Sequence, residues 1–239
     1  MVDNLPYNVF VMGGYYRPLF GRYTPDHTAL SQIMMASATT GAPTNTSREL
    51  WEAFSAGTAP NVPYLNVHYI ARGFTPDEPD HKGFIINTGL RFVTLGGSLN
   101  YSYWNSEDDS DLKSKVRVEM QDLNLALTKW NFILELDAMF LTRDDVSRDF
   151  RKGAVYTADL KYRFWRENYL TGEYASANTN KDLSPGSSEQ IRFGAKSFII
   201  PGVEVSLIYA IDKSIKEPLD EESIAYDIDY IQAMLHTYF

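Results

Sequence analysis

The chain closes on Tyr230-Ile231-Gln232-Ala233-Met234-Leu235-His236-Thr237-Tyr238-Phe239, and this stretch decides how the rest of the sequence is interpreted. Counted back from the end, every second residue belongs to one set, and four of the five members of that set are apolar. Alternation with a period of two is typical of a β-strand with two unlike faces. The stretch therefore predicts a terminal strand whose apolar face ends on an aromatic ring. The five members of the set are Phe239, Thr237, Leu235, Ala233 and Ile231.

Composition excludes several classes of protein. The chain has 239 residues, no Cys and a formal net charge of -9. The absence of Cys excludes disulfides, thiolate metal sites and covalent haem attachment, and the negative charge disfavours nucleic acid as a partner. The sequence has no run of about 18 apolar residues, so it predicts no transmembrane helix. This does not exclude a membrane β-barrel, because barrel strands alternate lumen-facing and lipid-facing residues and are hydrophilic on average. Aromatic residues make up 14% of the chain, which suits a barrel with interfacial girdles.

The same period of two recurs along the whole chain and predicts about 12 strands. Each candidate is roughly 10 to 14 residues long, where a tilted transmembrane strand needs about 9 to 11. Within the strand at 114–128 the alternation slips between Met120 and Leu123, which predicts a β-bulge near Gln121 and Asp122. The candidates lie at 5–17, 46–56, 62–74, 83–95, 97–106, 114–128, 131–143, 153–165, 168–180, 188–200, 203–214 and 226–239.

The connections between these candidates alternate in length. Short turns on one side and longer polar loops on the other are typical of bacterial β-barrels, with the short turns in the periplasm. A soluble sandwich has no reason to keep that alternation throughout. The predicted short turns are Gly57–Asn61, Leu95–Gly96, Thr128–Trp130, Arg166–Glu167 and Pro201–Gly202, and the predicted long loops are 75–82, 107–113, 144–152, 181–187 and 215–225.

Aromatic residues recur at one spacing on the apolar faces of three strands. The pairs Phe84 and Phe92, Phe132 and Phe140, and Tyr156 and Phe164 are each eight residues apart. At about 3.3 Å per residue, eight residues span roughly 26 Å along a strand, or about 20 Å along the membrane normal for a strand tilted near 40°. The spacing indicates an apolar band between two aromatic girdles.

Taken together, these features resemble the outer-membrane β-barrels of Gram-negative bacteria, and porins in particular. The resemblance implies that residues 1–239 form a single antiparallel transmembrane β-barrel domain in the outer membrane. In that family the last strand is the signal read by the barrel-assembly machinery, and here Phe239, Leu235 and Ile231 would carry it. The implied surroundings are outer-membrane lipid and lipopolysaccharide, with a homo-oligomer or a periplasmic partner left open. Met1 leads directly into strand-like sequence, so we expect either a removed leader or further strands upstream.

The faces opposite the apolar ones carry the charge, and in a barrel they would line the lumen. Positive and negative side chains are nearly balanced there, which predicts a weakly selective pore or charges that pair across neighbouring strands. The pore-lining candidates are His68, Arg72, Asn87, Arg91, Arg117, Glu119, Glu135, Asp137, Asp159, Lys161, Arg163, Glu173, Arg192, Lys196, Glu204 and Asp212.

One connection, 18–45, is much longer than the others. The segment 13–28 resembles a part of some general and anion-selective porins in which a strand with aromatics and Pro-x-x-Gly leads into a loop that folds into the lumen. A loop of this length is usually functional or disordered. We therefore expect 18–45 to constrict the pore, with a mobile external loop as the alternative.

Catalytic and metal-binding patterns are weak. The four His residues show no pairing that would hold a metal, and no nucleophile elbow or phosphate-binding loop is present. We therefore expect no enzyme, no metal and no cofactor. Three functions remain: a passive diffusion porin, a conduit barrel around a periplasmic partner such as a multihaem cytochrome, or a soluble ligand-binding β-protein. The sequence favours the porin.

Overall fold

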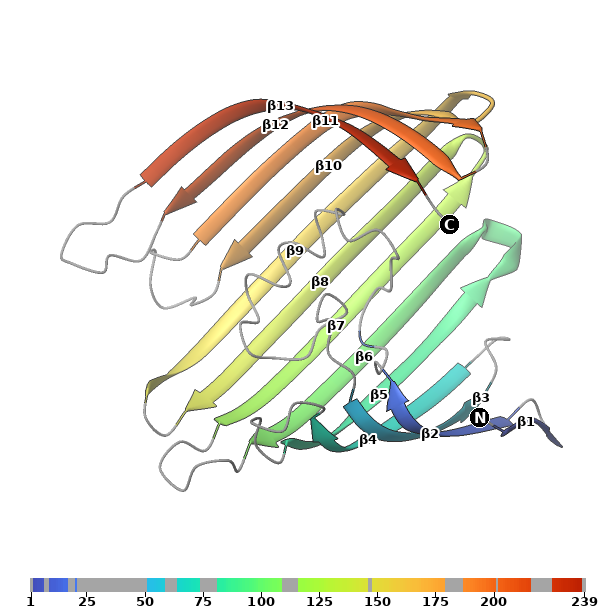
Figure 1. Cartoon of the computed structure of the whole chain (residues 1–239), viewed down its shortest axis with the longest axis vertical. Coiled ribbons are helices and arrows are strands. Elements are labelled where there is room, and N and C mark those ends of the chain that lie inside the picture. Colours follow the sequence, from blue (N-terminus) through green and yellow to red (C-terminus); the bar gives the residue numbers. More distant parts are fainter. Residues whose placement is uncertain are drawn as a thin grey trace.

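A computed structural model describes residues 2–6, 9–16, 20, 51–58, 64–73, 81–108, 116–145, 148–178, 187–200, 202–215 and 225–237 of the chain. These residues form one sheet of 13 strands, in which every strand pairs antiparallel with its neighbours in the sequence. Figure 1 shows the sheet curving from β2 through β7 to β13, so that one face is concave. In the described part of the chain no helix is long and apolar enough to cross a membrane.

The 13 strands cross the sheet in the order of the sequence. They are β1 Val2–Leu5, β2 Val9–Tyr16, β3 Trp51–Thr58, β4 Tyr64–Gly73, β5 His81–Phe92, β6 Gly97–Asp108, β7 Val116–Lys129, β8 Phe132–Asp145, β9 Arg148–Trp165, β10 Asn168–Asn178, β11 Ser187–Ile200, β12 Val203–Ile215 and β13 Ala225–Thr237. A short 3-10 helix, η2 Val93–Leu95, joins β5 to β6.

The predicted all-β, antiparallel architecture is confirmed, and most strand bounds agree within a few residues. The strand expected at 5–17 corresponds to β2, and β1, which ends at Leu5 just before Pro6, is an additional strand that was not predicted. Because proline has no backbone N–H to donate to a ladder, an end of β1 before this residue is physically reasonable.

Two details of the prediction are wrong. The expected loop at 144–152 is strand for most of its length, since only residues 146 and 147 separate β8 from β9 and Asp145 pairs with Arg148. The expected bulge near Gln121 is absent, because β6 and β7 stay in register from Asp108 opposite Val116 to Gly97 opposite Leu127. Alternation on β7 is unbroken.

The short connections gather at one end of the sheet and use positive φ angles. Trp130 and Arg166 are non-glycine residues with φ of 53° and 45°, and each opens a two-residue turn of the kind that suits the twist of a hairpin. Gly96 after η2 has φ 64°, and a Cβ at this position would collide with the carbonyl oxygen of Thr128. The turn between β5 and β6 therefore requires glycine.

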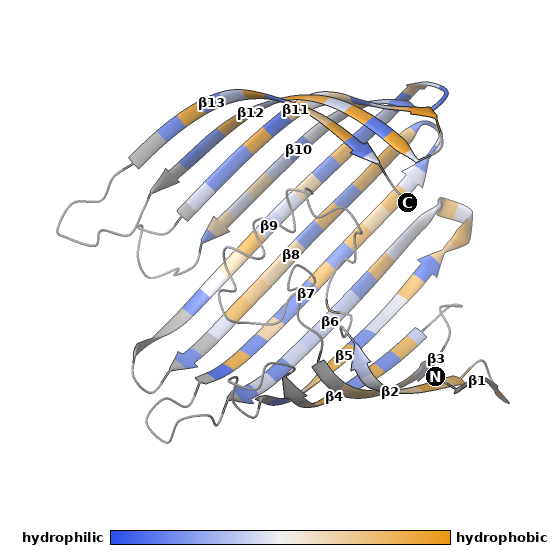
Figure 2. Cartoon of the chain, in the orientation of Figure 1, coloured by the Kyte–Doolittle hydropathy of each residue, from blue (hydrophilic) through white to orange (hydrophobic). Residues whose placement is uncertain are grey.

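Hydrophilic and hydrophobic residues alternate along the strands (Figure 2), and the two faces of the sheet therefore differ in chemistry. On the outer face the three predicted aromatic pairs are each 39% to 50% exposed, with Leu123, Leu160 and Leu207 also exposed between the aromatic levels. On the inner face the alternate residues are mostly buried and many are polar, for example Asp122, Asn124 and Thr157. An apolar outer band and a polar inner face are the arrangement of a membrane barrel.

Candidate pore lining

Most of the predicted pore-lining side chains lie on the inner face. The alternation of buried and exposed residues places 13 of the 16 there. These are His68, Asn87, Arg91, Glu135, Asp137, Asp159, Lys161, Arg163, Glu173, Arg192, Lys196, Glu204 and Asp212. Their role in a pore stays a prediction, since it is their position alone that the structure gives.

Three of the predicted side chains are not placed on that face. Arg117 and Glu119 were assigned to the wrong face, because on β7 the inner residues are Val118, Met120 and Asp122. Both charged residues lie on the outer face, beyond Gln121, which pairs with Phe140. They are therefore past one of the two aromatic levels, where headgroups and water replace hydrocarbon. The side chain of Arg72 lies outside the described residues.

One row of inner residues, polar apart from Ala175, crosses seven strands. Neighbours in the row face each other directly in the strand register, from β6 to β12. We call this row the amide–carboxylate belt; it consists of Asn100, Asn124, Asp137, Thr157, Ala175, Gln190 and Asp212.

Hydrogen bonds link the polar members of the belt in two groups, one on each side of Ala175. Asn100 Nδ2 donates to Asn124 Oδ1 at 3.1 Å, and Asn124 Nδ2 donates to Asp137 Oδ1 at 3.0 Å. Thr157 Oγ1 donates to the other oxygen of Asp137 at 3.5 Å. On the other side of Ala175, on β11 and β12, Gln190 Nε2 donates to Asp212 Oδ2 at 3.1 Å. The belt is thus a set of side chains that orient one another.

A tyrosine fixes one end of the belt from two strands away. Tyr64 on β4 donates from its hydroxyl to Asn100 Oδ1 on β6 at 2.9 Å, although β5 lies between them. The phenol ring can cross β5 because Gly89, which pairs with Tyr64, has no side chain. A Cβ on Gly89 would lie 2.6 Å from Tyr64 Cε1 and would also meet Asn100 Oδ1. Glycine at this position is therefore a condition of the contact.

Ion pairs lie on the short-turn side of the belt. Lys161 Nζ is 3.9 Å from Glu135 Oε2, and Glu173 lies 3.8 Å from Arg192 Nη1 and 3.7 Å from Lys196 Nζ. The Glu173 and Arg192 side chains are each 7% exposed. The prediction that inner charges pair across strands is confirmed for these residues.

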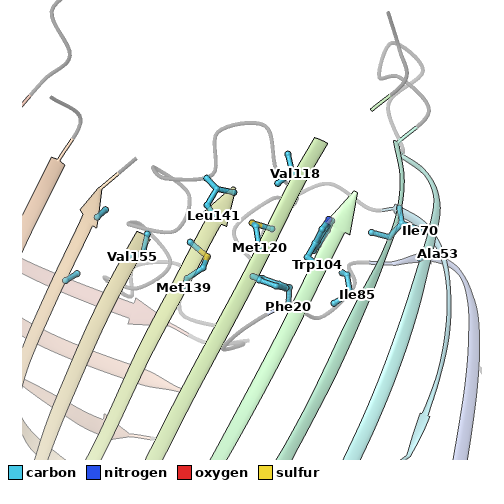
Figure 3. Close-up of a cluster of buried hydrophobic side chains, with 12 residues drawn as sticks. Phe20, Ala53, Ile70, Ile85, Trp104, Val118, Met120, Met139, Leu141 and Val155 are labelled. Atoms are coloured by element: carbon cyan, nitrogen blue, oxygen red, sulfur yellow. The ribbon is translucent and has the colours of Figure 1, made fainter. Parts of the chain in front are cut away.

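An apolar patch lies on the inner face on the other side of the belt, toward the longer connections. It includes Ile85, Trp104, Met120 and Met139, each at most 1% exposed. Phe20 is fully buried against this patch, with its ring 5.8 Å from the Trp104 ring in an edge-on arrangement (Figure 3). Phe20 belongs to the predicted constriction loop 18–45; the rest of that loop lies outside the described residues.

Sequence reasoning missed the residues that organise this inner face. These residues were not among the candidates, although unbroken alternation places all five on the inner face: Tyr64, Asn100, Asp122, Asn124 and Gln190. The assumed bulge on β7 reversed only the residues before it, which is how Arg117 and Glu119 came to be assigned to the inner face. Nothing in the sequence marks the contact of Tyr64 with Asn100, because it depends on Gly89 of another strand.

The predicted assembly signal is described only in part. Ile231 and Leu235 lie on the outer face of β13, 72% and 66% exposed, while Phe239 lies outside the described residues. Within the described strands, no group of three or more His, Asp or Glu side chains is arranged to hold a metal ion.

Solved structures of outer-membrane proteins share the fold. The chain is similar to a loop L8 deletion mutant of OmpT, an outer membrane protein of Vibrio cholerae, with a TM-score of 0.64 and 11% identity over 95% of this chain and 75% of that chain. It is similar to an anion-selective porin from Comamonas acidovorans, with a TM-score of 0.62 and 12% identity over 87% of this chain and 65% of that chain. In-vitro folded OmpT in its trimer form gives a TM-score of 0.58 at 11% identity, covering 92% of this chain and 72% of that chain.

No family model matches the sequence, and no curated protein matches it. At 11% to 12% identity the structural neighbours establish architecture and nothing finer. The chain therefore has the fold of the outer-membrane β-barrel proteins of Gram-negative bacteria, as its sequence predicted.

Proposed function

We propose that this chain forms the wall of an outer-membrane channel through which ions and small hydrophilic solutes diffuse passively. The observation that carries the proposal is the contrast between the two faces of the same strands. On β7 the outward residues Leu123, Leu125 and Leu127 alternate with the inward residues Asp122, Asn124 and Ala126. An apolar exterior suits lipid, and a hydrogen-bonded and charged interior suits water and solutes.

The buried position of Phe20 supports a constriction within this channel. Phe20 follows β2 in the sequence and packs on Trp104 of the inner face, so the chain has entered the concave side at this residue. A segment attached to the wall in this way would narrow the passage. The proposed channel has no catalytic role, and its partners are outer-membrane lipid, lipopolysaccharide and the barrel-assembly machinery, with other copies of the chain or a periplasmic protein as further candidates.

Single-channel recording tests the proposal. The purified, folded protein is added to a planar bilayer in KCl, and we expect discrete steps of conductance whose size scales with salt concentration. Heat-modifiable electrophoretic mobility provides the control for folding. A folded protein that inserts but never conducts would contradict the proposal and would favour a conduit barrel whose lumen is filled by a partner; haem absorbance that co-purifies with it would identify a cytochrome as that partner.

A further inference from the structure

A pocket of about 500 Å³ lies at the short-turn end of the sheet, between the turn that joins β9 to β10 and the last residues of β11. Two backbone contacts hold these segments together. Asn168 pairs with Ser197 in the strand register, and the Phe198 N–H donates to the carbonyl oxygen of Glu167 at 3.1 Å. The volume lies in the range of roughly 300 to 1,000 Å³ that is usual for small-molecule sites.

The apolar wall of the pocket lies at the level of the membrane interface. Trp165 follows Phe164, which belongs to the aromatic level nearer the short turns, and Trp165, Ile199 and Ile200 are 58% to 66% exposed. Tryptophan is enriched where hydrocarbon meets headgroups, because its ring is apolar at one end and polar at the other. The pocket therefore opens at the depth at which lipid headgroups lie.

The polar side chains of the pocket carry one charge of each sign. Arg166 and Glu167 line it together with Asn168 and Ser197. Within the described part of the chain, neither Arg166 nor Glu167 forms an ion pair. The Tyr169 hydroxyl donates to Glu167 Oε2 at 3.2 Å, and a neutral donor orients a carboxylate without removing its charge. A matching ligand would present an anion to Arg166 and a cation to Glu167.

Trp165 orients the Arg166 guanidinium. Arg166 Cζ lies 5.2 Å from the centroid of the Trp165 ring, which is within the range of a cation–π contact. Such stacking occupies one face of the guanidinium and leaves the N–H groups at its edge able to donate to an anion. The backbone of Arg166 has φ 45°, a conformation that favours glycine or asparagine. An arginine at this position is therefore better explained by its side chain than by the turn.

A phospholipid with a phosphoethanolamine headgroup matches these features. Its phosphate accepts charge-assisted hydrogen bonds from a guanidinium, and its primary ammonium donates to a carboxylate. Its acyl chains would lie along Leu170 and Phe193, which are 51% and 57% exposed on the outer faces of β10 and β11. Short turns lie on the periplasmic side of a barrel, and in an outer membrane that side is the phospholipid leaflet, whereas lipopolysaccharide fills the other.

We propose that the pocket beside the β9–β10 turn binds a phospholipid with a phosphoethanolamine headgroup, with Arg166 on the phosphate and Glu167 on the ammonium. This site goes beyond the channel function and does not depend on it, because it requires the outer-membrane fold alone. A lipid bound here would fix the depth of the short-turn end in the periplasmic leaflet.

Native mass spectrometry of the folded protein in detergent tests the proposal, with dioleoyl phosphatidylethanolamine, phosphatidylglycerol and phosphatidylcholine as the added probes. We expect phosphatidylethanolamine to bind most tightly, because phosphatidylglycerol has no cation and the choline group has no N–H to donate. Arg166→Gln should weaken phosphatidylethanolamine binding by about tenfold or more, since it removes a hydrogen bond between charged groups. Glu167→Gln should abolish the preference for phosphatidylethanolamine over phosphatidylglycerol while binding of phosphatidylglycerol continues.

Lys129→Gln is the matched control. Lys129 also stacks on a tryptophan at a short turn, with Nζ 5.0 Å from the centroid of Trp130, but it does not line the pocket. This variant should bind phosphatidylethanolamine as the wild type does, and heat-modifiable mobility checks that each variant is folded. If Arg166→Gln or Glu167→Gln fails to fold, the other variant is decisive. Equal affinity of the wild type for the three lipids, wild-type binding in Arg166→Gln, or an equal loss in Lys129→Gln would overturn the proposal.

Discussion

Two adjacent residues of β7 provide a sharp test of which face meets lipid. Leu125 faces outward between Leu99 of β6 and Leu136 of β8, and Ala126 faces inward opposite Glu135. Leu125 also lies between the two aromatic levels, because Gln121 pairs with Phe140 and Lys129 pairs with Phe132. An arginine at either position has the same backbone, the same strand and nearly the same depth.

The expected effects of the two substitutions differ widely. Leu125→Arg places a guanidinium in hydrocarbon, which costs about 2 to 4 kcal/mol near the midplane of a bilayer. A cost of about 3 kcal/mol lowers the ratio of folded to unfolded protein by more than about a hundredfold. Ala126→Arg places the same group in the lumen opposite a carboxylate, where a cross-strand pair contributes about 0.2 to 1 kcal/mol in favour of folding.

The assay is urea unfolding of the protein folded into lipid vesicles, followed by heat-modifiable mobility and intrinsic fluorescence. We expect a large drop in the unfolding midpoint for Leu125→Arg and a midpoint close to wild type for Ala126→Arg. Equal losses for both variants, or a larger loss for Ala126→Arg, would show that the faces have been assigned the wrong way round.

Three further predictions concern the inner face. Gly89→Ala should displace the Tyr64 ring from Asn100 and increase current noise. Gly172→Ala is the control, because its added methyl would meet nothing closer than Phe193 Cδ1 at 3.9 Å, and it should leave the recordings unchanged. Equal noise in both variants would mean that the contact between Tyr64 and Asn100 does not steady the current. Phe20→Ala should weaken attachment to the Trp104 patch by about 3 to 5 kcal/mol, the usual cost of losing a buried phenylalanine, and raise conductance; wild-type conductance would mean that this contact does not hold a constriction. Deleting Thr28 to Thr44 should raise conductance with the sheet still folded, because a loop adds little to the strand ladder, and an unchanged conductance in a folded barrel would exclude that segment as the narrowing element.

The strands and their two faces could largely be predicted from the sequence, because alternation is a local property. Strands such as β11 and β12 follow from their own residues, and so do the aromatic pairs on the outer face. The assignment of Arg117 and Glu119 failed for a physical reason: β7 has 14 residues, whereas crossing the bilayer takes about 9 to 11. The excess residues stand beyond the apolar band, where an outward charge meets water. A charge at the end of a long strand is therefore a poor guide to its face.

The belt could not be predicted from the sequence, because it depends on the register between strands. That Asn124 faces Asp137 follows from the two-residue turn at Trp130 and Asn131, and a shift of one residue would have turned every side chain to the other face. Tyr64 illustrates the same limit, since its partner lies two strands away and the contact depends on the absence of a side chain at Gly89. Local periodicity contains neither fact.

The chain contains no Cys, so a single-cysteine scan of β7 from Asp122 to Leu127 tests the central claim most directly. Each variant is folded into vesicles and labelled in turn with a water-soluble thiol reagent and with a fluorophore that brominated lipid chains quench. We expect alternation: the fluorophore on cysteines at Leu123, Leu125 and Leu127 should be quenched by lipid, and cysteines at Asp122, Asn124 and Ala126 should escape lipid quenching. Of these three, Ala126 is the least buried and should react from the aqueous side. Labelling without a period of two, or alternation with the opposite phase, would contradict a membrane-spanning strand with a polar inner face.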